Sequence, residues 1–328
     1  MRNNELERGV TIILCTYNGA QRLPETIAHL AAQVVSHNIK WEVIFIDNAS
    51  SDNSTAVALA EWEKHKVEGV DFKTVAESTP GKLFAFQKGI NLAKYEYFVI
   101  CDDDNWLNPD YLNIAFGILE KDPDIGAVGG QTIAVTEDNA PLPDWFETFK
   151  EGYAVGRQAA KTGDISSRGH LWGAGLTSRT SLYLEAYQEL PSILLTSKDQ
   201  KILSTEDTEY CLRLVLKGYQ LYYDSRLRLK HFIPKARLTL AYKDGLYKNF
   251  ANAHSLLERY YLSIKFGRNN KLNIADKIRL TVVTPFRFAF ASSKEKRTKQ
   301  RVILSYLLPS MFKADPITAK IKTFIMND

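Results

Sequence analysis

The sequence predicts an α/β protein built on a mostly parallel sheet with helices on both faces. Apolar, β-branched runs alternate with segments of helical periodicity up to about residue 131, and three of these runs end in polar side chains. Strands that alternate with helices favour a parallel sheet covered on both sides. In open sheets of this kind, ligands bind beyond the carboxyl ends of the strands. We therefore expect those polar side chains to share one crevice.

Each element follows from its own stretch of sequence. Strands are expected in GVTIILCTYNG, WEVIFIDN, VDFKTVAE, YEYFVICDDD and IGAVGGQTIAV, and helices in LPETIAHLAAQVV, STAVALAEWEKHK, GKLFAFQKGINLAK and NPDYLNIAFGILEKDP. A long mixed segment then leads to a helix and a short strand in STEDTEYCLRLVLKGYQLYYD, with Gly218 as its helix C-cap. Beyond His231 the chain is expected to be helical, basic and aromatic.

Composition limits the class of protein. The 328 residues, 45% of them hydrophobic, suit one large domain or one domain with an appendage. The three cysteines are scattered singly, which is typical of buried thiols in a reducing compartment. The start, MRNNELERGV, lacks the apolar segment of a signal peptide, and LTVVTPFRFAFA is too short to span a bilayer. We therefore expect a cytoplasmic protein.

The net charge of +4 hides two regions of opposite sign. From Arg226 onward there are 22 lysines and arginines against 6 aspartates and glutamates, a balance of +16, which leaves −12 for the first 225 residues. Such an asymmetry favours two regions with different partners. Nucleic acid, an anionic membrane surface and a polyphosphate ligand each fit the basic part.

Three consecutive aspartates, Asp102 to Asp104, follow the apolar run YFVIC. Like charges side by side repel, so a positive partner is expected. Mg²⁺ and Mn²⁺ prefer oxygen ligands and often combine one or two carboxylates with substrate phosphates. Asp102 and Asp104, two apart on a segment expected to be extended, would point to the same side. Helix capping is the alternative, since Asn105, Asn108 and Asp110 compete as caps for the following helix, but a cap needs one such residue and not three carboxylates.

Seven segments, in this order, resemble one enzyme family: VTIILCTYN, IDNASSDNS, PGKLFAFQKGI, CDDDNWLNPDYL, WGAGLTSR, TEDTEYCLRLVLKGYQLYY and KHFIP. The chain resembles the family 2 glycosyltransferases with the GT-A fold over roughly residues 9 to 235, and LPDWF…GYAVGRQ…GDIS…LWGAG resembles a bacterial surface-polysaccharide type. The resemblance implies a GT-A nucleotide-sugar-binding and catalytic domain over residues 1–235, followed by a helical basic region over residues 236–328. It also implies an inverting, metal-dependent sugar transfer from a nucleotide donor, UDP-linked by resemblance only, to a glycan or polyprenyl-diphosphate-linked acceptor.

The resemblance implies a donor site made of Thr16, Tyr17, Asn18, Asp47, Asn48, Lys82, Asp102 and Asp103. Tyr17 would pack on the base and Asp47 would meet its polar edge, unless Tyr17 is only an aromatic at the rim. Lys82 would contact the base or the phosphates, or else it is an exposed lysine at a helix start. Relatives often have a second aspartate where this chain has Asn48, and A-R-N where it has Ala85-Phe86-Gln87.

The resemblance gives the remaining roles to residues later in the chain. Asp104 would bind Mg²⁺ or Mn²⁺ directly, with Asp102 and His231 as further ligands, although a lone histidine is more often a structural hydrogen-bonder. Asp207 in TEDTEY would be the catalytic base, and Glu206 would support it or contact the acceptor. Acidic residues that complement a helix N-terminus are the alternative for this pair.

The acceptor site is expected to contain Trp145, Trp172 and Gly173, with Phe146 beside them. Aromatic faces suit the C–H faces of sugars, but large aromatic side chains are mostly core.

In the basic region, LLERYYLSIKF, KIRLTVVTPFRFAF and RVILSYLLPSMFK are similar to interfacial helices that meet anionic lipids. This pattern makes an anionic membrane surface a candidate partner and the inner face of the cell membrane a candidate location. A helical subdomain packed on the catalytic domain is the alternative. Two other functions compete: an inactive homologue that binds sugar nucleotide or glycan, and nucleic-acid binding, which no recognised module supports.

Overall fold

The computed structural model describes residues 5–65, 67–196, 205–267 and 273–326. Its centre is a nine-stranded sheet of order β3-β2-β1-β4-β8-β6-β9-β5, with β7 paired to β9. The strands β3, β2, β1 and β4 are parallel, β8 runs antiparallel to both its neighbours, and β6 and β9 are parallel to each other. The predicted α/β class with a mostly parallel sheet is confirmed.

The strands are β1 Glu7–Thr16, β2 Lys40–Asn48, β3 Asp71–Glu77, β4 Tyr95–Asp102, β5 Asn105–Leu107, β6 Ile125–Thr136, β7 Gly163–Asp164, β8 Thr177–Arg179 and β9 Gln220–Ile233. The helices are α1 Leu23–Ala31, α2 Ser54–His65, α3 Lys82–Ile90, α4 Tyr111–Lys121, α5 Phe146–Phe149, α6 Thr180–Glu189, α7 Glu206–Leu216, α8 Leu240–Phe266, α9 Ile274–Ala289, α10 Lys294–Leu307 and α11 Pro316–Met326. All five strands expected before residue 137 are present, whereas the strand expected after Gly218 continues to Ile233.

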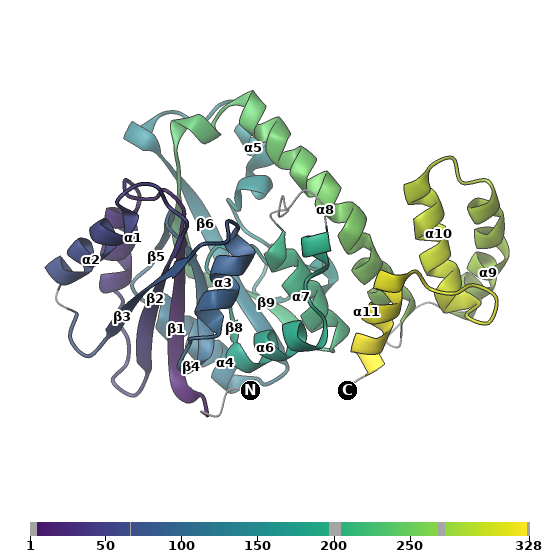
Figure 1. Cartoon of the computed structure of the whole chain (residues 1–328), viewed down its shortest axis with the longest axis horizontal. Coiled ribbons are helices and arrows are strands. Elements are labelled where there is room, and N and C mark those ends of the chain that lie inside the picture. The colour runs from purple at the N-terminus through teal and green to yellow at the C-terminus, as the bar shows by residue number, and fades with distance from the viewer. Residues whose placement is uncertain (1–4, 66, 197–204, 268–272, 327–328) are drawn as a thin grey trace.

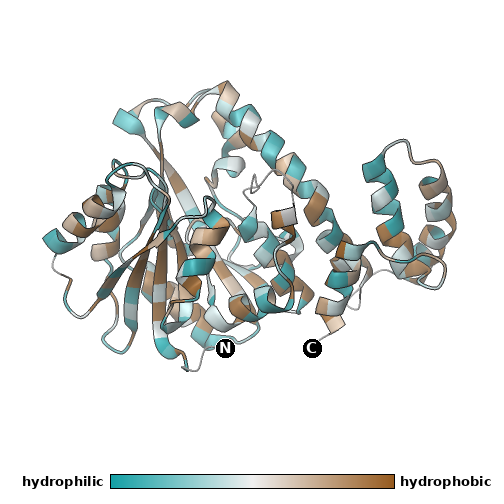
Figure 2. Cartoon of the chain, in the orientation of Figure 1, coloured by the Kyte–Doolittle hydropathy of each residue, from teal (hydrophilic) through white to brown (hydrophobic). Residues whose placement is uncertain are grey.

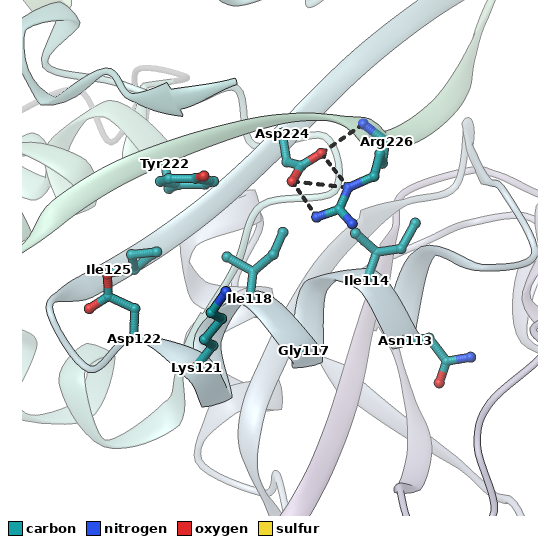
Figure 3. Close-up of a pocket in the computed structure, with 10 residues that line it drawn as sticks. All are labelled: Asn113, Ile114, Gly117, Ile118, Lys121, Asp122, Ile125, Tyr222, Asp224 and Arg226. Atoms are coloured by element: carbon teal, nitrogen blue, oxygen red, sulfur yellow. Dashed lines mark hydrogen bonds and ion pairs between the residues drawn. The ribbon is translucent and has the colours of Figure 1, made fainter. Parts of the chain in front are cut away.

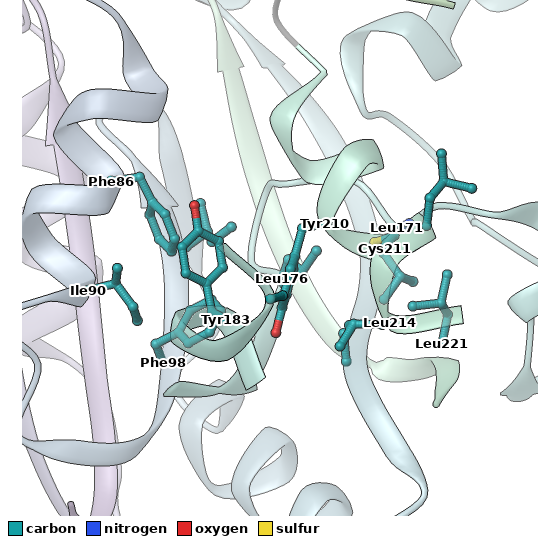
Figure 4. Close-up of a cluster of buried hydrophobic side chains, with 14 of the residues drawn as sticks. Phe86, Ile90, Phe98, Leu171, Leu176, Tyr183, Tyr210, Cys211, Leu214 and Leu221 are labelled. Carbon is teal, nitrogen blue, oxygen red and sulfur yellow. Dashed lines mark hydrogen bonds between the residues drawn. The ribbon is translucent and has the colours of Figure 1, made fainter. Parts of the chain in front are cut away.

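Two hydrophobic cores, one on each face of the sheet, explain why the central strands are apolar runs. Alternate side chains of β1 enter different cores, since Ile13 belongs to one cluster and Ile12 and Leu14 belong to the other. The first core lies under α3, α6 and α7 and is rich in aromatic rings, among them Phe98, Tyr183 and Tyr210, as Figure 4 shows. The second lies under α1, α2 and α4. A strand buried on both faces loses the polar alternation of a half-exposed strand.

One glycine sets the register of the later strands. The pairing of β6 with β9 shifts between Gly129 and Gln131. A Cβ added at Gly130 would stand 1.9 Å from the carbonyl oxygen of Leu227, so the two backbones approach too closely for any larger residue. The bulge lets the second half of β9 pair along β6 as far as Ile233, which carries β9 toward the carboxyl end of the sheet.

A buried ion pair joins α7 to its neighbours. Glu209 and Arg213 both have fully buried side chains, and their closest charged atoms lie 2.7 Å apart. The Glu209 carboxylate also accepts hydrogen bonds from the hydroxyls of Ser192 and Tyr260. The guanidinium of Arg213 donates to backbone carbonyls after α6, among them that of Pro191. This network fixes the helix that begins at Glu206 and Asp207 against both α6 and α8.

The helices after β9 form two parts, as Figure 1 shows. The middle of α8 and the helix α11 complete the first core, through Leu257 and Tyr260 on α8 and Ile321 and Phe324 on α11. The α9–α10 hairpin lies farther from the sheet, and a separate small cluster joins it to the end of α8.

The exposure of the three segments expected to be interfacial differs. The first, LLERYYLSIKF, belongs to α8, where Leu257, Tyr260, Leu262 and Phe266 are buried. The third, RVILSYLLPSMFK, buries residues 302–305 of α10. In KIRLTVVTPFRFAF, on α9 and its C-cap, Ile278, Val282, Phe286 and Phe290 are exposed, while Leu280, Val283 and Phe288 are half-buried. Across the described ranges, no helix combines the length and the apolarity needed to cross a bilayer.

Candidate functional site

A cavity of about 440 Å³ opens at the carboxyl ends of β1 and β4. Ten of the residues assigned from the sequence line it: Thr16, Tyr17, Asn48, Lys82, Asp102, Asp103, Asp104, Glu206, Asp207 and His231. The site expected at this edge of the sheet is therefore a single cavity. It draws on segments more than 200 residues apart in the chain.

The three aspartates lie in a tight connection between strands. Asp102 ends β4, and Asp103 and Asp104 form the turn into β5, so the segment expected to be extended is bent. Each carboxylate consequently faces a different partner: Lys82 for Asp102, Arg22 for Asp103 and Arg237 for Asp104. Basic side chains of the protein itself therefore supply the positive partners that the sequence leads us to expect.

Asp103 organises the loop after β1. Its two carboxylate oxygens accept hydrogen bonds from Nε and Nη2 of Arg22, both at 2.8 Å, and one of them also accepts from the hydroxyl of Thr16. Its backbone carbonyl accepts a hydrogen bond from the hydroxyl of Thr26. A Cβ added at Gly19 would stand 2.3 Å from the carboxylate, so the loop closes tightly over it. The Asp103 side chain is thus occupied in holding this loop.

Asp104 faces two basic groups of the later chain. One carboxylate oxygen accepts a hydrogen bond from Nη1 of Arg237 at 2.8 Å, and the other lies 3.5 Å from Nε2 of His231. Burial raises the pKa of Asp104, but His231, Arg237 and Lys82 lower it by more, so the pKa stands well below its usual value. This carboxylate is therefore an anion at neutral pH.

Strand pairing brings His231 to this place. It lies within β9, rather than after a short strand, and it pairs with Asn105 of β5, directly beside Asp104. Its Nδ1 lies 2.8 Å from the carbonyl oxygen of Tyr153, which can only accept, so Nδ1 carries the proton. In a neutral imidazole, the lone pair of Nε2 would then face the Asp104 carboxylate. A bound cation or a second ring proton makes this contact favourable.

The charge of the cavity also favours a cation. Its described lining holds five carboxylates, those of Asp102, Asp103, Asp104, Glu206 and Asp207, and three permanent cations, those of Arg22, Lys82 and Arg237. Two negative charges remain uncompensated when His231 is neutral. Within the described residues there is no cluster of three or more His, Cys, Asp or Glu side chains arranged for a metal. A divalent ion here would therefore need phosphate or water oxygens besides Asp104, Asp102 and His231, as Mg²⁺ sites commonly do.

Lys82 links the aspartates to the start of α7. Its Nζ lies 2.7 Å from Asp102 and 3.7 Å from Glu206. Burial lowers the pKa of the Lys82 ammonium, but Asp102 and Glu206 raise it by more, so this group stays charged. For Glu206, burial is the main cause of a raised pKa; Lys82 opposes this rise and Asp207 adds to it. The ammonium of Lys82 thus ties a carboxylate of the acidic turn to one at the start of α7.

Asp207 is held from both sides by backbone donors. One carboxylate oxygen accepts from N–H of Gly173 at 2.7 Å, and the other accepts from N–H of Thr208 at 2.6 Å. A Cβ added at Gly173 would lie 3.2 Å from the first oxygen, so glycine leaves room for this contact. The second oxygen also accepts from the hydroxyl of Thr208 at 3.3 Å, so the oxygen that faces Gly173 is the one that keeps a lone pair able to accept a proton. The arrangement orients a carboxylate into the cavity without neutralising it.

Of the residues expected to contact the nucleoside, some line the cavity and others do not. Tyr17 lines the cavity with 60% of its surface exposed, so its ring is available to a flat ligand. Asn48 also lines the cavity, but its amide is fully engaged by the backbone of residues 77–81. Asp47 and Asn18 are not among the described lining residues. Asp47 accepts hydrogen bonds from the backbone N–H of Ser50, before α2, and from the hydroxyl of Thr55, on α2. Asn18 accepts a hydrogen bond from the backbone N–H of Ser51.

The aromatic residues expected at the acceptor side lie outside the described lining of this cavity. Trp172 is buried, its backbone N–H bonds Gln158, and the guanidinium of Arg168 lies over its ring. Trp145 packs with Phe146 and Tyr153 in a small separate cluster. Gly173 alone reaches the site, through Asp207.

Sequence reasoning missed the basic residues Arg22 and Arg237 and the whole contribution of α8. Tyr242, Leu246 and Phe250, on the first half of α8, line the same cavity as the aspartates. The region expected to begin at residue 236 therefore supplies part of the wall. The spacing of Tyr242, Leu246 and Phe250 at four-residue steps was a visible signal for one helix face. Nothing local in the sequence indicates which surface that face covers.

A second cavity, of about 640 Å³, lies at the opposite edge of the sheet (Figure 3). Residues at the amino ends of β6 and β9, Ile125 and Tyr222, line it together with one face of α4. Two of its four charged residues, Asp224 and Arg226, bond each other. Because the catalytic carboxylates expected from the sequence all lie at the other edge, this cavity is not the candidate site.

Comparison with known proteins identifies the kind of enzyme that this geometry resembles. Residues 11–170 match the family model described as "Glycosyl transferase family 2". A poly-beta-1,6-N-acetyl-D-glucosamine synthase of Staphylococcus aureus (strain COL) is 30% identical over 127 residues, which cover 39% of this chain and 29% of that protein. The synthase of the same name from Staphylococcus epidermidis is 32% identical over 123 residues, 37% of this chain and 28% of that protein. The match thus spans less than a third of these relatives' length.

Two solved structures are similar along most of the chain. TarS residues 1–349 of S. aureus, in complex with UDP-GlcNAc, match with a TM-score of 0.51 and 15% identity, over 91% of each chain. The mannosyltransferase PcManGT from Pyrobaculum calidifontis, in complex with GDP-Man and Mn²⁺, matches with a TM-score of 0.52 and 17% identity, over 98% of this chain and 85% of that one. At such identities the likeness shows the fold alone, and that fold is the expected GT-A fold.

Proposed function

This chain belongs to glycosyl transferase family 2 through residues 11–170, and on that basis we propose that it is an inverting, metal-dependent glycosyltransferase. The donor would be a nucleotide sugar, UDP-linked, and the acceptor a glycan or a polyprenyl-diphosphate-linked saccharide of surface polysaccharide biosynthesis. The observation that carries the proposal is the shared cavity, which is lined both by the acidic turn with His231 and by Asp207. One set of groups suits a metal-bound diphosphate and the other suits an acceptor hydroxyl.

The residues of the cavity would perform two tasks: binding the donor with its metal ion, and activating the acceptor hydroxyl. Asp104, with Asp102 and His231, would hold Mg²⁺ or Mn²⁺, which neutralises the negative charge that develops on a departing diphosphate. Lys82 and Arg237 already line the same space as permanent cations and would bind phosphate oxygens once the carboxylates serve the metal. Tyr17, with its exposed ring, would lie against the base.

On the acceptor side, Asp207 would take the proton of the acceptor hydroxyl. The oxygen of that hydroxyl forms the new bond to the anomeric carbon from the face opposite the diphosphate, and the bond between that carbon and the diphosphate oxygen breaks. Glu206, next to Lys82, would orient the acceptor. The backbone N–H groups of Gly173 and Thr208 hold the carboxylate in position throughout.

The nature of the donor rests on similarity as well as chemistry. The curated relatives are synthases of a polymer of N-acetylglucosamine, and one solved structure of the same fold binds UDP-GlcNAc. Another holds GDP-Man with Mn²⁺. UDP-GlcNAc is therefore the first donor to examine. A peripheral position on the inner face of the cell membrane would suit a lipid-linked acceptor.

Donor choice can be measured through thermal stability. A ligand that binds only the folded state stabilises it by about 2.7 kcal/mol at a concentration of 100 times its Kd. We expect a UDP-sugar to raise the melting temperature with Mn²⁺ present and much less without it, while the matching GDP-sugars serve as the control. Hydrolysis or transfer of that sugar then separates an enzyme from an inactive binding homologue. No stabilisation by any nucleotide sugar with Mn²⁺ would contradict the proposal.

A further inference from the structure

Helix α9 carries a continuous apolar stripe on its solvent side. Five large apolar residues recur at every fourth position: Ile274, Ile278, Val282, Phe286 and Phe290, which we call the α9 stripe. Their exposed fractions are 76%, 61%, 59%, 65% and 84%. A helix of 16 residues is about 24 Å long, so the stripe runs its whole length, from Ile274 to the C-cap Phe290. Each four-residue step turns about 40° around the helix axis, so Ile278, Val282 and Phe286 share one face and the two end residues lie at its margins. Contiguous apolar surface of this kind marks a contact site on a soluble protein.

The orientation of α9 is the reverse of an ordinary surface helix, which turns its apolar face inward. The one residue of α9 that is fully packed against the protein is Thr284. Of the apolar side chains on the inner side, Leu280 is half-buried against the cluster that joins α10 to the end of α8. The sequence of this helix therefore provides an apolar face that the described part of the chain does not cover.

Basic residues surround the stripe. Arg279 and Arg287 lie on α9, and Lys294, Lys296 and Arg297 lie in the first turns of α10; all five are exposed. None of the five has an ion-pair partner within 4.0 Å among the described residues, although Arg297 lies over the ring of Phe288. A shallow cavity of about 460 Å³ is lined by Phe286, Phe290, Arg287 and Lys296 together, so apolar and basic side chains share one surface.

We propose that the α9 stripe enters the headgroup region of an anionic lipid bilayer, with the surrounding basic residues on the lipid phosphates. Helices that lie in such an interface combine an apolar face with lysine and arginine. Each basic residue near an anionic surface adds to the electrostatic attraction. A second copy of the chain would bring these cations against one another, and a nucleic acid would leave the stripe uncovered. The proposal deepens the peripheral location proposed above, and rests on it for its biological setting.

The α9 stripe and the candidate site are far apart, although α8 contacts both the cavity and the α9–α10 hairpin. The first half of α8 lines the cavity, whereas Leu262 and Phe266 at its end pack against Val302 and Ile303 of α10. The α9–α10 hairpin lies at the right-hand side of Figure 2, away from the sheet. Substitutions on the stripe should therefore leave the cavity intact.

The test is co-flotation of the full chain with lipid vesicles at low salt. We expect the protein to float with vesicles that contain phosphatidylglycerol and not with pure phosphatidylcholine vesicles. The double variant I278E/F286E should partition at least about tenfold less into the anionic vesicles, because it loses apolar burial and adds repulsive charge. V34E/L59E, which changes two exposed apolar residues on the opposite side of the domain, is the matched control and should float as the wild type does.

A second variant keeps the experiment decisive if I278E/F286E folds poorly. K294E/K296E leaves the stripe intact and should also lose flotation. Wild-type protein that does not float, I278E/F286E that floats undiminished, or equal binding to both kinds of vesicle would each overturn the proposal. So would a lipid-free dimer that I278E/F286E converts to a monomer, because a second copy would then cover the stripe.

Flotation requires no turnover, so it tests membrane binding independently of the proposed enzyme activity. Transfer to a soluble acceptor should be equal in I278E/F286E and wild type. Failure of the membrane proposal is therefore distinguishable from failure of the proposed enzyme activity.

Discussion

Asp207→Asn is expected to reduce turnover by about 10²–10⁴-fold, the range that a positioned general base contributes. Asparagine keeps the size of the side chain, and its carbonyl oxygen can still accept the N–H of Gly173. Its amide nitrogen cannot accept, so the hydrogen bond from the N–H of Thr208 is lost, but this donor lies next to Asp207 in the chain and the contact to Gly173 keeps the side chain in place. It offers no carboxylate to take the proton of the acceptor hydroxyl. Steady-state kinetics with the donor identified by thermal stabilisation would give kcat, and calorimetry would give the affinities for donor and Mn²⁺, which should be unchanged.

Two further variants test whether the loss of turnover is specific to Asp207. Asp110→Asn removes a carboxylate from an exposed position just before α4, where its side chain makes no capping hydrogen bond, and should turn over normally. Glu206→Gln tests the neighbouring carboxylate of the same helix start. Turnover of Asp207→Asn within a few-fold of wild type would remove the base assignment, and a greater loss in Glu206→Gln would transfer it to Glu206.

Arg213→Met is expected to destabilise the fold by about 3–5 kcal/mol, since it leaves the buried carboxylate of Glu209 without its cation. Domains are typically stable by only about 5–15 kcal/mol, so this is a large share of the total. The hydroxyls of Ser192 and Tyr260 would still donate to the carboxylate, but they carry no compensating charge. Urea-induced unfolding, followed by circular dichroism, gives the change in the free energy of unfolding.

The matched control is Arg8→Met, which breaks a surface pair with Glu120 whose arginine side chain is 47% exposed. It should cost less than about 1 kcal/mol. The double variant E209Q/R213M should recover part of the loss, because no unpaired charge is then buried. Equal stability of Arg213→Met and Arg8→Met would show that the buried pair is not what fixes α7.

Much of the sheet could be predicted because its signals are local. The runs at β1, β2 and β4 are apolar on both faces, and their polar ends mark the carboxyl edge of the sheet. The acidic turn and the start of α7 were recognisable as sequence motifs, and the structure brings both into one cavity. The bend at Asp103 and Asp104 was missed because a three-residue strand, β5, follows too closely for periodicity to reveal it.

The length of β9 was underestimated although the sequence held a signal for it. In residues 226–230 the basic side chains alternate with Leu227 and Leu229, which are buried, and this is the two-residue period of a half-exposed strand. That continuation places His231 opposite Asn105. The pairing joins residues more than 120 positions apart, so no local pattern could have placed the histidine beside Asp104.

The contribution of α8 depends on packing that only the folded chain reveals. Arg237 and the three α8 side chains at the cavity come from a region whose composition resembles a basic appendage. The same composition is shared by α8, α9 and α10, yet α8 and α10 bury apolar side chains in clusters whereas α9 leaves Ile274, Ile278, Val282 and Phe286 exposed. Hydropathy alone does not separate a helix that completes a core from one that lies on the surface.

The central claim is that Asp104 holds a divalent ion together with the donor's diphosphate, and Mn²⁺ binding tests it most directly. Electron paramagnetic resonance of Mn²⁺, titrated with UDP present, should reveal one bound ion per wild-type chain. Because loss of a supporting outer partner already costs about 10–100-fold in metal affinity, Asp104→Asn should weaken this binding by about 100-fold or more, while Asp110→Asn should leave it unchanged. Undiminished Mn²⁺ affinity in Asp104→Asn, or no bound Mn²⁺ in the wild type with UDP, would contradict the account.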